Sequence, residues 1–185
     1  TEELGGVFEH TISTFRIARY QVTYDLWYTV RKWAESDERG ANKYSFANKG
    51  REGSEGTIGA APTDAKNEPV TNVSWRDVIV WCNAYSEMTG LTPVYYTDSG
   101  YAMPLRTSTN STIVSTEPGS EDKPYVSWFA TGYRLPSEGE WQYAASYIDG
   151  TSWTSYTWAS GASAASTNEE ANKEVAWYHV NSNGK

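Results

Sequence analysis

The 185-residue chain has very few of the side chains that build disulfides and transition-metal sites. It holds one cysteine, Cys82, and two histidines, His10 and His179. A single thiol cannot form an internal disulfide and excludes a metal site built on a Cys-x-x-Cys pair. Two isolated histidines argue against a histidine-rich zinc site. We therefore predict no metal ligands and no disulfide stabilisation in this chain.

Positive charge and long apolar runs are also scarce. Lysine and arginine together number 15 against 23 acidic residues, which sets the formal net charge at −8 and the pI near 4.8. This charge repels a phosphate backbone, and no run of basic residues offsets it, so we predict no nucleic-acid partner. No apolar stretch approaches the roughly 20 residues that a membrane-spanning helix needs. We predict no transmembrane segment.

Aromatic residues are abundant in contrast. The chain has 9 Trp, 14 Tyr and 4 Phe, or 15% of all residues, although only 38% of the chain is hydrophobic. This content excludes intrinsic disorder, which goes with few aromatic residues. The core must be built largely from rings whose indole N–H and phenol O–H groups need hydrogen-bond partners when buried.

Three helices can be predicted from their capping residues and apolar spacing. Thr23 precedes a helix over residues 24–35, and Ser74 with Asp77 opens a second over 75–88, which Gly90 ends. The apolar stripe of the second helix contains Val78, Trp81, Cys82 and Tyr85. Ser137 and Glu140 open a third, short helix that should direct Trp141, Ala144 and Ala145 inward.

The rest of the chain is predicted to be short strands and long loops. Alternation or apolar content favours strands at 9–17, 92–96, 111–114 and 175–178, and Pro136 favours an extended segment at 133–136. Residues 36–69, with Phe46 and Ile58 as anchors, 97–124 and 149–172 have loop composition. No linker or repeat divides the chain. We predict a single α+β domain over residues 1–185, rich in loops, with two to three short helices and short antiparallel strands.

Three blocks of the sequence carry a family resemblance. They are YQVTYDLW at 20–27, PVTNVSWRDVIVWCN at 69–83 and GYRLPSEGEWQYAA at 132–145. Together they resemble the signatures of the formylglycine-generating enzyme (sulfatase-modifying factor) family. The resemblance implies a variant of the C-type lectin fold. It is closest to the branch that holds the variable proteins of diversity-generating retroelements, which display a hypervariable ligand-binding surface.

The resemblance implies two functions, which belong to different classes of protein. The first is a non-enzymatic protein that binds a protein or other macromolecular ligand. By analogy with the family it would be exported or held at the cell surface, where a lipid anchor is one means of attachment. The second is a formylglycine-generating enzyme or a related copper-dependent oxidase, whose cysteine pair belongs to the C-terminal half of the family. In either case residues 1–185 would be the N-terminal framework portion. We favour the binding protein because no catalytic residue can be identified here.

The resemblance also bears on cofactors. Copper is implied only for the oxidase. Calcium is possible in the family, but one family calcium site uses an asparagine just before the segment matched here by 175–177, and this chain has Glu174 there. We therefore identify no cofactor.

The candidate site residues fall into two groups. Cys82 lies in the middle of an apolar helical stripe, so we interpret it as a core residue rather than a nucleophile. Arg134 and Glu140 are interpreted as structural. The framework residues are Trp27, Ser74, Trp75, Asp77, Trp81, Cys82, Arg134, Glu140 and Trp141. The loop rings Trp128, Trp153, Tyr156 and Trp158 form either a sugar- or peptide-binding platform or a plug in the core, and we favour the plug.

Overall fold

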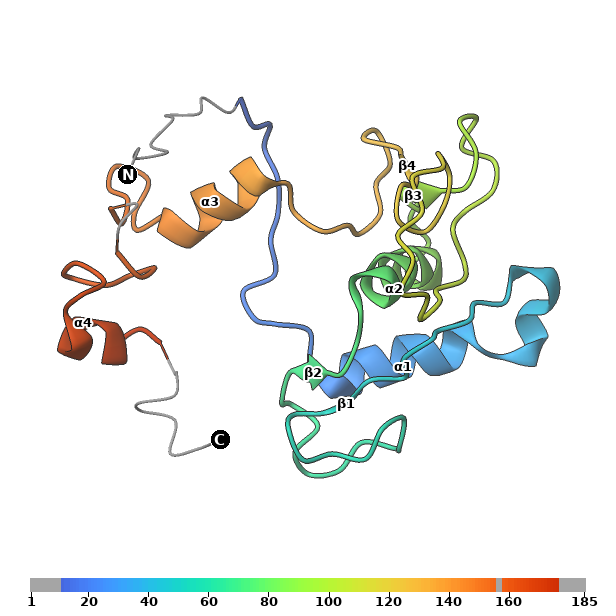
Figure 1. The fold of residues 1–185 in the computed structure, drawn as a ribbon, viewed down its shortest axis with the longest axis horizontal. Coiled ribbons are helices and arrows are strands. Elements are labelled where there is room, and N and C mark those ends of the chain that lie inside the picture. Colours follow the sequence, from blue (N-terminus) through green and yellow to red (C-terminus); the bar gives the residue numbers. More distant parts are fainter. Residues whose placement is uncertain (1–10, 156–157, 177–185) are drawn as a thin grey trace. The chain divides into compact units, whose positions relative to one another are not determined.

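A computed structural model describes residues 11–155 and 158–176 of the chain (Figure 1). The chain separates into two compact units. One comprises residues 19–135, and the other comprises residues 1–18 together with 136–185. The prediction of one domain over 1–185 stays a prediction.

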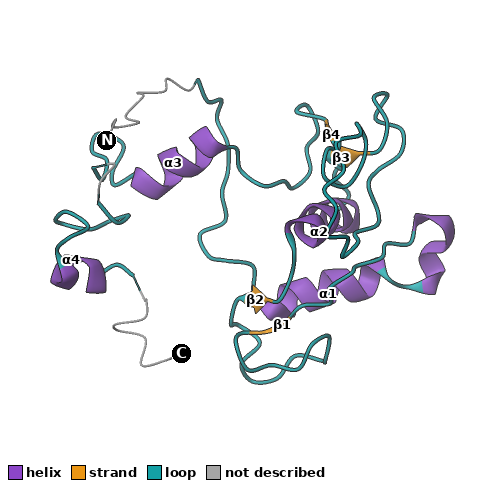
Figure 2. Ribbon diagram, viewed as in Figure 1, coloured by secondary structure: helices purple, strands orange, loops and turns teal. Residues whose placement is uncertain are grey.

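The described elements are short and separated by long loops (Figure 2). The helices are α1 (Tyr24–Ala34), the 3₁₀ helix η1 (Asp37–Asn42), α2 (Trp75–Met88), α3 (Glu138–Ser146) and α4 (Glu169–Lys173). The strands are β1 (Arg51–Glu52), β2 (Val70–Thr71), β3 (Tyr95–Tyr96) and β4 (Tyr125–Val126). β1 pairs antiparallel with β2, and β3 pairs antiparallel with β4. This α+β arrangement confirms the predicted fold class.

The core of the unit over 19–135 lies between α1 and α2. Thr23 caps α1 by accepting a hydrogen bond from the Leu26 amide. Trp27 of α1 stacks on Trp81 of α2, with ring centroids 5.5 Å apart and planes at 6°. Each indole N–H has a partner: that of Trp27 donates to the Lys49 carbonyl at 3.0 Å, and that of Trp81 donates to the Trp27 carbonyl. The two stacked indoles thus meet their hydrogen-bonding needs with backbone oxygens.

Helix α2 is buried around most of its circumference. As predicted, Ser74 and Asp77 form a capping box at its start, and Gly90 adopts a positive φ of 74° after its end. The burial extends beyond the predicted stripe to Ile79, Val80 and Asn83. A loop-rich unit has few elements to form a core, so the unit packs loops and strands around this one helix.

The Asn83 amide attaches the β3 segment to α2. Its Nδ2 donates to the carbonyls of Tyr95 and Leu105 at 2.7 and 3.0 Å, and its Oδ1 accepts from the amides of Val94 and Tyr95, both at 3.0 Å. Asn83 is fully buried, so all four bonds form away from water. In a larger sheet, a neighbouring strand would satisfy these backbone groups; here the Asn83 side chain satisfies them.

Charged side chains hold the long loops in place. The Arg76 guanidinium pairs with Asp122 through Nε at 2.6 Å and also donates to the carbonyls of Ser111 and Ile113. The Glu87 carboxylate accepts from Arg39 and Arg106. The Arg76 bonds satisfy two carbonyls of this loop from the side, and residues 111–114 do not form the predicted strand.

The third predicted helix forms, but its predicted burial is wrong. Ser137 and Glu140 form the capping box of α3. Trp141, however, is 60% exposed, because the described residues of this unit leave most of its indole uncovered. The buried residues of α3 are Gly139 and Glu140.

Several smaller predictions are also corrected. Ile58, predicted as a loop anchor, is exposed, whereas Phe46 is buried as expected. Trp75, predicted as a framework residue, is half exposed at the start of α2. Residues 11–17 form no strand, and residues 9 and 10 lie outside the described residues. The loop predicted over 149–172 contains the start of α4. The strand predicted at 175–178 is absent from 175–176, and its remainder lies outside the described residues. Within the described part of the chain, no helix is long and apolar enough to cross a membrane.

Candidate functional site

Trp128 and Phe129 lie on the loop that follows β4. Trp128 is 63% exposed and Phe129 is 99% exposed. The Arg134 guanidinium carbon lies 5.1 Å from the centroid of a Trp128 ring, a cation–π distance, and Arg134 also donates to the Leu135 carbonyl at 3.0 Å. The plug interpretation is therefore wrong for Trp128. The sequence analysis did not single out Phe129, although it directly follows the candidate Trp128.

Three rings in the other unit form what we call the aromatic cluster: Tyr143, Tyr147 and Trp153. The centroid distances are 5.9 Å between the tyrosines and 6.0 and 6.4 Å from Trp153 to Tyr143 and Tyr147. The three side chains are between 40% and 48% exposed. Phe15 contacts the Tyr143 ring edge-on at 6.2 Å. The rings thus support one another while each leaves nearly half of its surface open to a ligand.

The aromatic cluster has a simple local origin. Tyr143 and Tyr147 are four residues apart at the end of α3, so they lie on the same side of the helix. A turn over residues 148–152, in which Asp149 accepts hydrogen bonds from the Thr151 and Ser152 amides, brings Trp153 back to pair with Tyr147. The predicted platform residue Trp153 belongs to this cluster, and the two tyrosines were missed, although their i, i+4 spacing was visible.

Of the two remaining loop rings, Trp158 lies among the described residues. Trp158 is exposed, and no ring contact joins it to the cluster among the described residues. Tyr156 lies outside the described residues. Among the described residues, Trp153 is therefore the one predicted platform residue with ring contacts to the tyrosines of the cluster.

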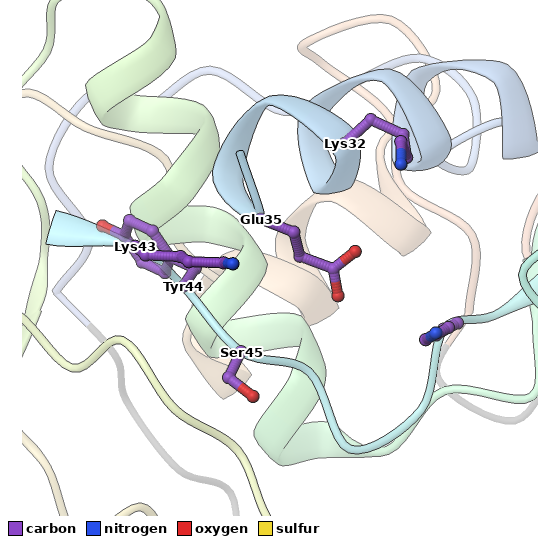
Figure 3. Close-up of a pocket in the computed structure, with 6 residues that line it drawn as sticks. Lys32, Glu35, Lys43, Tyr44 and Ser45 are labelled. Atoms are coloured by element: carbon purple, nitrogen blue, oxygen red, sulfur yellow. The ribbon is translucent and has the colours of Figure 1, made fainter. Parts of the chain in front are cut away.

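A surface hollow of about 490 Å³ lies beside the C-terminal half of α1. Its lining residues are Lys32, Glu35, Lys43, Tyr44, Ser45 and Lys49. Figure 3 shows the Glu35 carboxylate between the side chains of Lys32 and Lys43, with Ser45 on the facing segment. Three lysines against one glutamate make this hollow basic, in a chain whose overall charge is negative.

Cys82 lies on α2, in the hydrophobic core of the unit over 19–135. Burial raises the pKa of its thiol to about 12, so the nucleophilic thiolate is scarce at neutral pH. The other residues of interest as metal ligands, His10 and His179, lie outside the described residues. Within the described residues, no three His, Cys, Asp or Glu side chains come together in a way that could hold a metal ion.

The burial of Cys82 predicts slow thiol chemistry. We expect native protein to react with 5,5′-dithiobis(2-nitrobenzoate) on the order of 100-fold more slowly than the same protein in 6 M guanidinium chloride, because the thiolate is scarce and covered. The absorbance of the released thiolate measures both rates. Equal rates in the two conditions would show that Cys82 is accessible and contradict its placement in the core.

Short helices, two-residue antiparallel strands and long pinned loops define an α+β protein of the C-type lectin-like kind. The chain belongs to the family of the sulfatase-modifying factor enzyme 1-like domain, whose model matches residues 5–185. This confirms the family and the formylglycine-generating type of fold that the three sequence blocks predict.

Individual relatives also match most of the chain. The Chaperone protein LppX of Paenibacillus barcinonensis is 33% identical over 175 residues, which is 95% of this chain and 48% of that protein. The chain therefore spans about half the length of this relative. Variable protein 1 of Treponema denticola is similar in structure, with a TM-score of 0.55 and 25% identity over 89% of this chain and 50% of that chain. The crystal structure of CarF matches 68% of this chain and 42% of that one, at 32% identity and a TM-score of 0.49.

Proposed function

We propose that this chain is the framework of a non-enzymatic, protein-binding domain on a C-type lectin-type scaffold, related to variable proteins. The observation that carries this proposal is the aromatic cluster of Tyr143, Tyr147 and Trp153, whose rings are ordered and half exposed. Exposed tyrosine and tryptophan side chains provide much of the binding energy at protein interfaces.

Two of the relatives support a binding role. The similar structure from Treponema denticola is a variable protein, and the relative from Paenibacillus barcinonensis is named a chaperone, a class of protein that contacts other proteins. We propose that the ligand of this chain is likewise a protein. On the basis of the family resemblance, we also propose that the protein is exported to the cell surface.

The second candidate function is formylglycine generation, which the description of the matching family favours. Its copper would require a pair of cysteines, and the chain has only Cys82, whose thiol is buried. Residues 1–185 therefore supply no such pair, which the resemblance places in the C-terminal half of the family. The family resemblance also implies calcium, and among the described residues no three acidic, histidine or cysteine side chains come together to hold a metal ion.

The binding proposal can be tested with a defined unfolded protein. Reduced, carboxymethylated α-lactalbumin presents an extended chain, and native α-lactalbumin serves as the folded comparison. We expect the unfolded form to bind and Trp153→Ala to weaken binding about tenfold, since truncating an interface tryptophan costs more than about 1 kcal/mol. Surface plasmon resonance measures the Kd of each pair.

Tyr20→Ala is the matched control, because Tyr20 is also exposed but lies outside the aromatic cluster. Its Kd should equal that of the unaltered protein. Equal weakening by Tyr20→Ala and Trp153→Ala would contradict a role for the cluster. Conversion of a cysteine-containing sulfatase peptide to its aldehyde, in the presence of copper and oxygen, would overturn the non-enzymatic proposal.

A further inference from the structure

The basic hollow beside α1 gathers lysines from separate parts of the sequence. Lys32 lies in the last turns of α1, and Lys43 and Lys49 lie on the segment that follows η1. The chain has eight more acidic than basic residues, so a hollow with three lysines and one glutamate departs from its average surface. A helix C-terminus favours one nearby cation, but it does not account for the two lysines of the facing segment.

The nearby carboxylates already have cationic partners. Glu35 accepts a 2.7 Å hydrogen bond from the buried Arg31 guanidinium, so its charge is balanced from within the protein. Asp37 pairs with Lys43 at 2.5 Å, but Asp37 is almost fully exposed, and such pairs contribute little and exchange readily. In the described part of the chain, Lys32 and Lys49 form no ion pair. Lys32 and Lys49 thus line this hollow without an ion-pair partner of their own among the described residues.

The backbone around the hollow is fixed by buried anchors. The Tyr44 amide donates to the Ala34 carbonyl at the end of α1, at 2.9 Å, and the Ser45 amide donates to the Arg106 carbonyl at 2.9 Å. The Lys49 carbonyl accepts from the core indole of Trp27. The lysine side chains therefore extend from positions that folding itself sets, which lowers the entropic cost of binding a ligand between them.

We propose that this hollow binds a phosphate or sulfate oxyanion, either free or as an ester. The ammonium groups of Lys32, Lys43 and Lys49 would surround the anion, and the exposed Ser45 hydroxyl would add a neutral donor. The Glu35 carboxylate repels a bare anion, but it can accept a hydrogen bond from a hydroxyl group next to an esterified one. The hollow accordingly favours a hydroxylated ester over the inorganic ion.

Isothermal titration calorimetry at low ionic strength, with inorganic phosphate and with glycerol 1-phosphate as ligands, tests the site. The comparison of the two affinities distinguishes a free anion from an ester as the preferred ligand. We expect both to bind, and the ester to bind more tightly. The paired substitution Lys32→Gln/Lys49→Gln should weaken both at least tenfold. Glu35→Gln should raise the affinity for inorganic phosphate and not that for the ester. Tighter binding of the inorganic ion would identify the free anion as the ligand.

Lys123→Gln is the control, because Lys123 is exposed and lies outside the hollow. It should leave both affinities unchanged, and far-UV circular dichroism should show that every variant is folded. No detectable binding of either ligand up to 10 mM would overturn the proposal. Equal weakening by Lys123→Gln and by the paired substitution would overturn it as well, because binding would then reflect overall charge.

Discussion

Trp27→Ala is expected to lower the free energy of unfolding by about 3–5 kcal/mol, the range typical of truncating a buried tryptophan. Trp27 is 1% exposed, stacks on Trp81 and packs against Phe46 at a centroid distance of 6.0 Å. The substitution also removes the donor to the Lys49 carbonyl. Urea unfolding, followed by circular dichroism, measures the loss.

Trp141→Ala is the matched control, since it removes the same side chain from an exposed position. We expect it to cost less than about 1 kcal/mol, as surface substitutions do. A loss for Trp27→Ala as small as that for Trp141→Ala would contradict the stacked α1–α2 core. A loss of several kcal/mol for Trp141→Ala would instead show that the Trp141 indole is covered in solution.

Asp77→Ala is expected to cost about 3 kcal/mol or more, because it leaves several buried donors without an acceptor. The Asp77 carboxylate is fully buried and accepts from the Ser108 hydroxyl at 2.5 Å, the Asn48 side-chain amide at 2.7 Å and the Ser74 amide at 2.8 Å. It joins the start of α2 to two loops. Urea unfolding at pH 7 measures the loss of unfolding free energy. Ser137→Ala is the control, because it removes only the cap of α3 and should cost about 1 kcal/mol.

The same carboxylate predicts a dependence of stability on pH. Burial by itself raises the pKa of Asp77, but hydrogen bonds from Ser108, Asn48 and Ser74 outweigh it and hold the pKa below its ordinary value of 3.8. A pKa lowered by folding stabilises the protein above the ordinary value, and this stabilisation is lost as the pH falls through the lowered one. The difference in unfolding free energy between unaltered protein and Asp77→Asn should therefore be constant from pH 5 to 7 and shrink below pH 3.8. A difference that grows on acidification would contradict the lowered pKa.

The helices were predictable because their signals are local. A capping box joins residues three positions apart, so Ser74 with Asp77 and Ser137 with Glu140 could be identified before any tertiary contact was known. Burial was less predictable. Trp141 has the residue type and spacing of a core side chain, yet exposure depends on what lies over it, and no property of α3 alone determines that.

The candidate surfaces were predicted in part. Trp128 and Trp153 stand out as aromatic residues in loops, but the favoured interpretation placed them in the core. Tyr143 and Tyr147 were not singled out, because helix periodicity does not tell which side of a short helix faces the protein. The ring contacts between α3 and the turn that follows it settle that point.

The sequence by itself determined the family, the fold class, the helix starts and the aromatic origin of the core, since each depends on composition or on residues close together in the chain. Only the tertiary structure decided which groups meet across long separations. It placed the Asn83 amide against the β3 segment, and it brought Lys32 and Lys49 to one hollow in an acidic protein. The physical reason is that these contacts depend on hydrogen bonds, buried rings and ion pairs between residues far apart in the sequence, which no local pattern reveals.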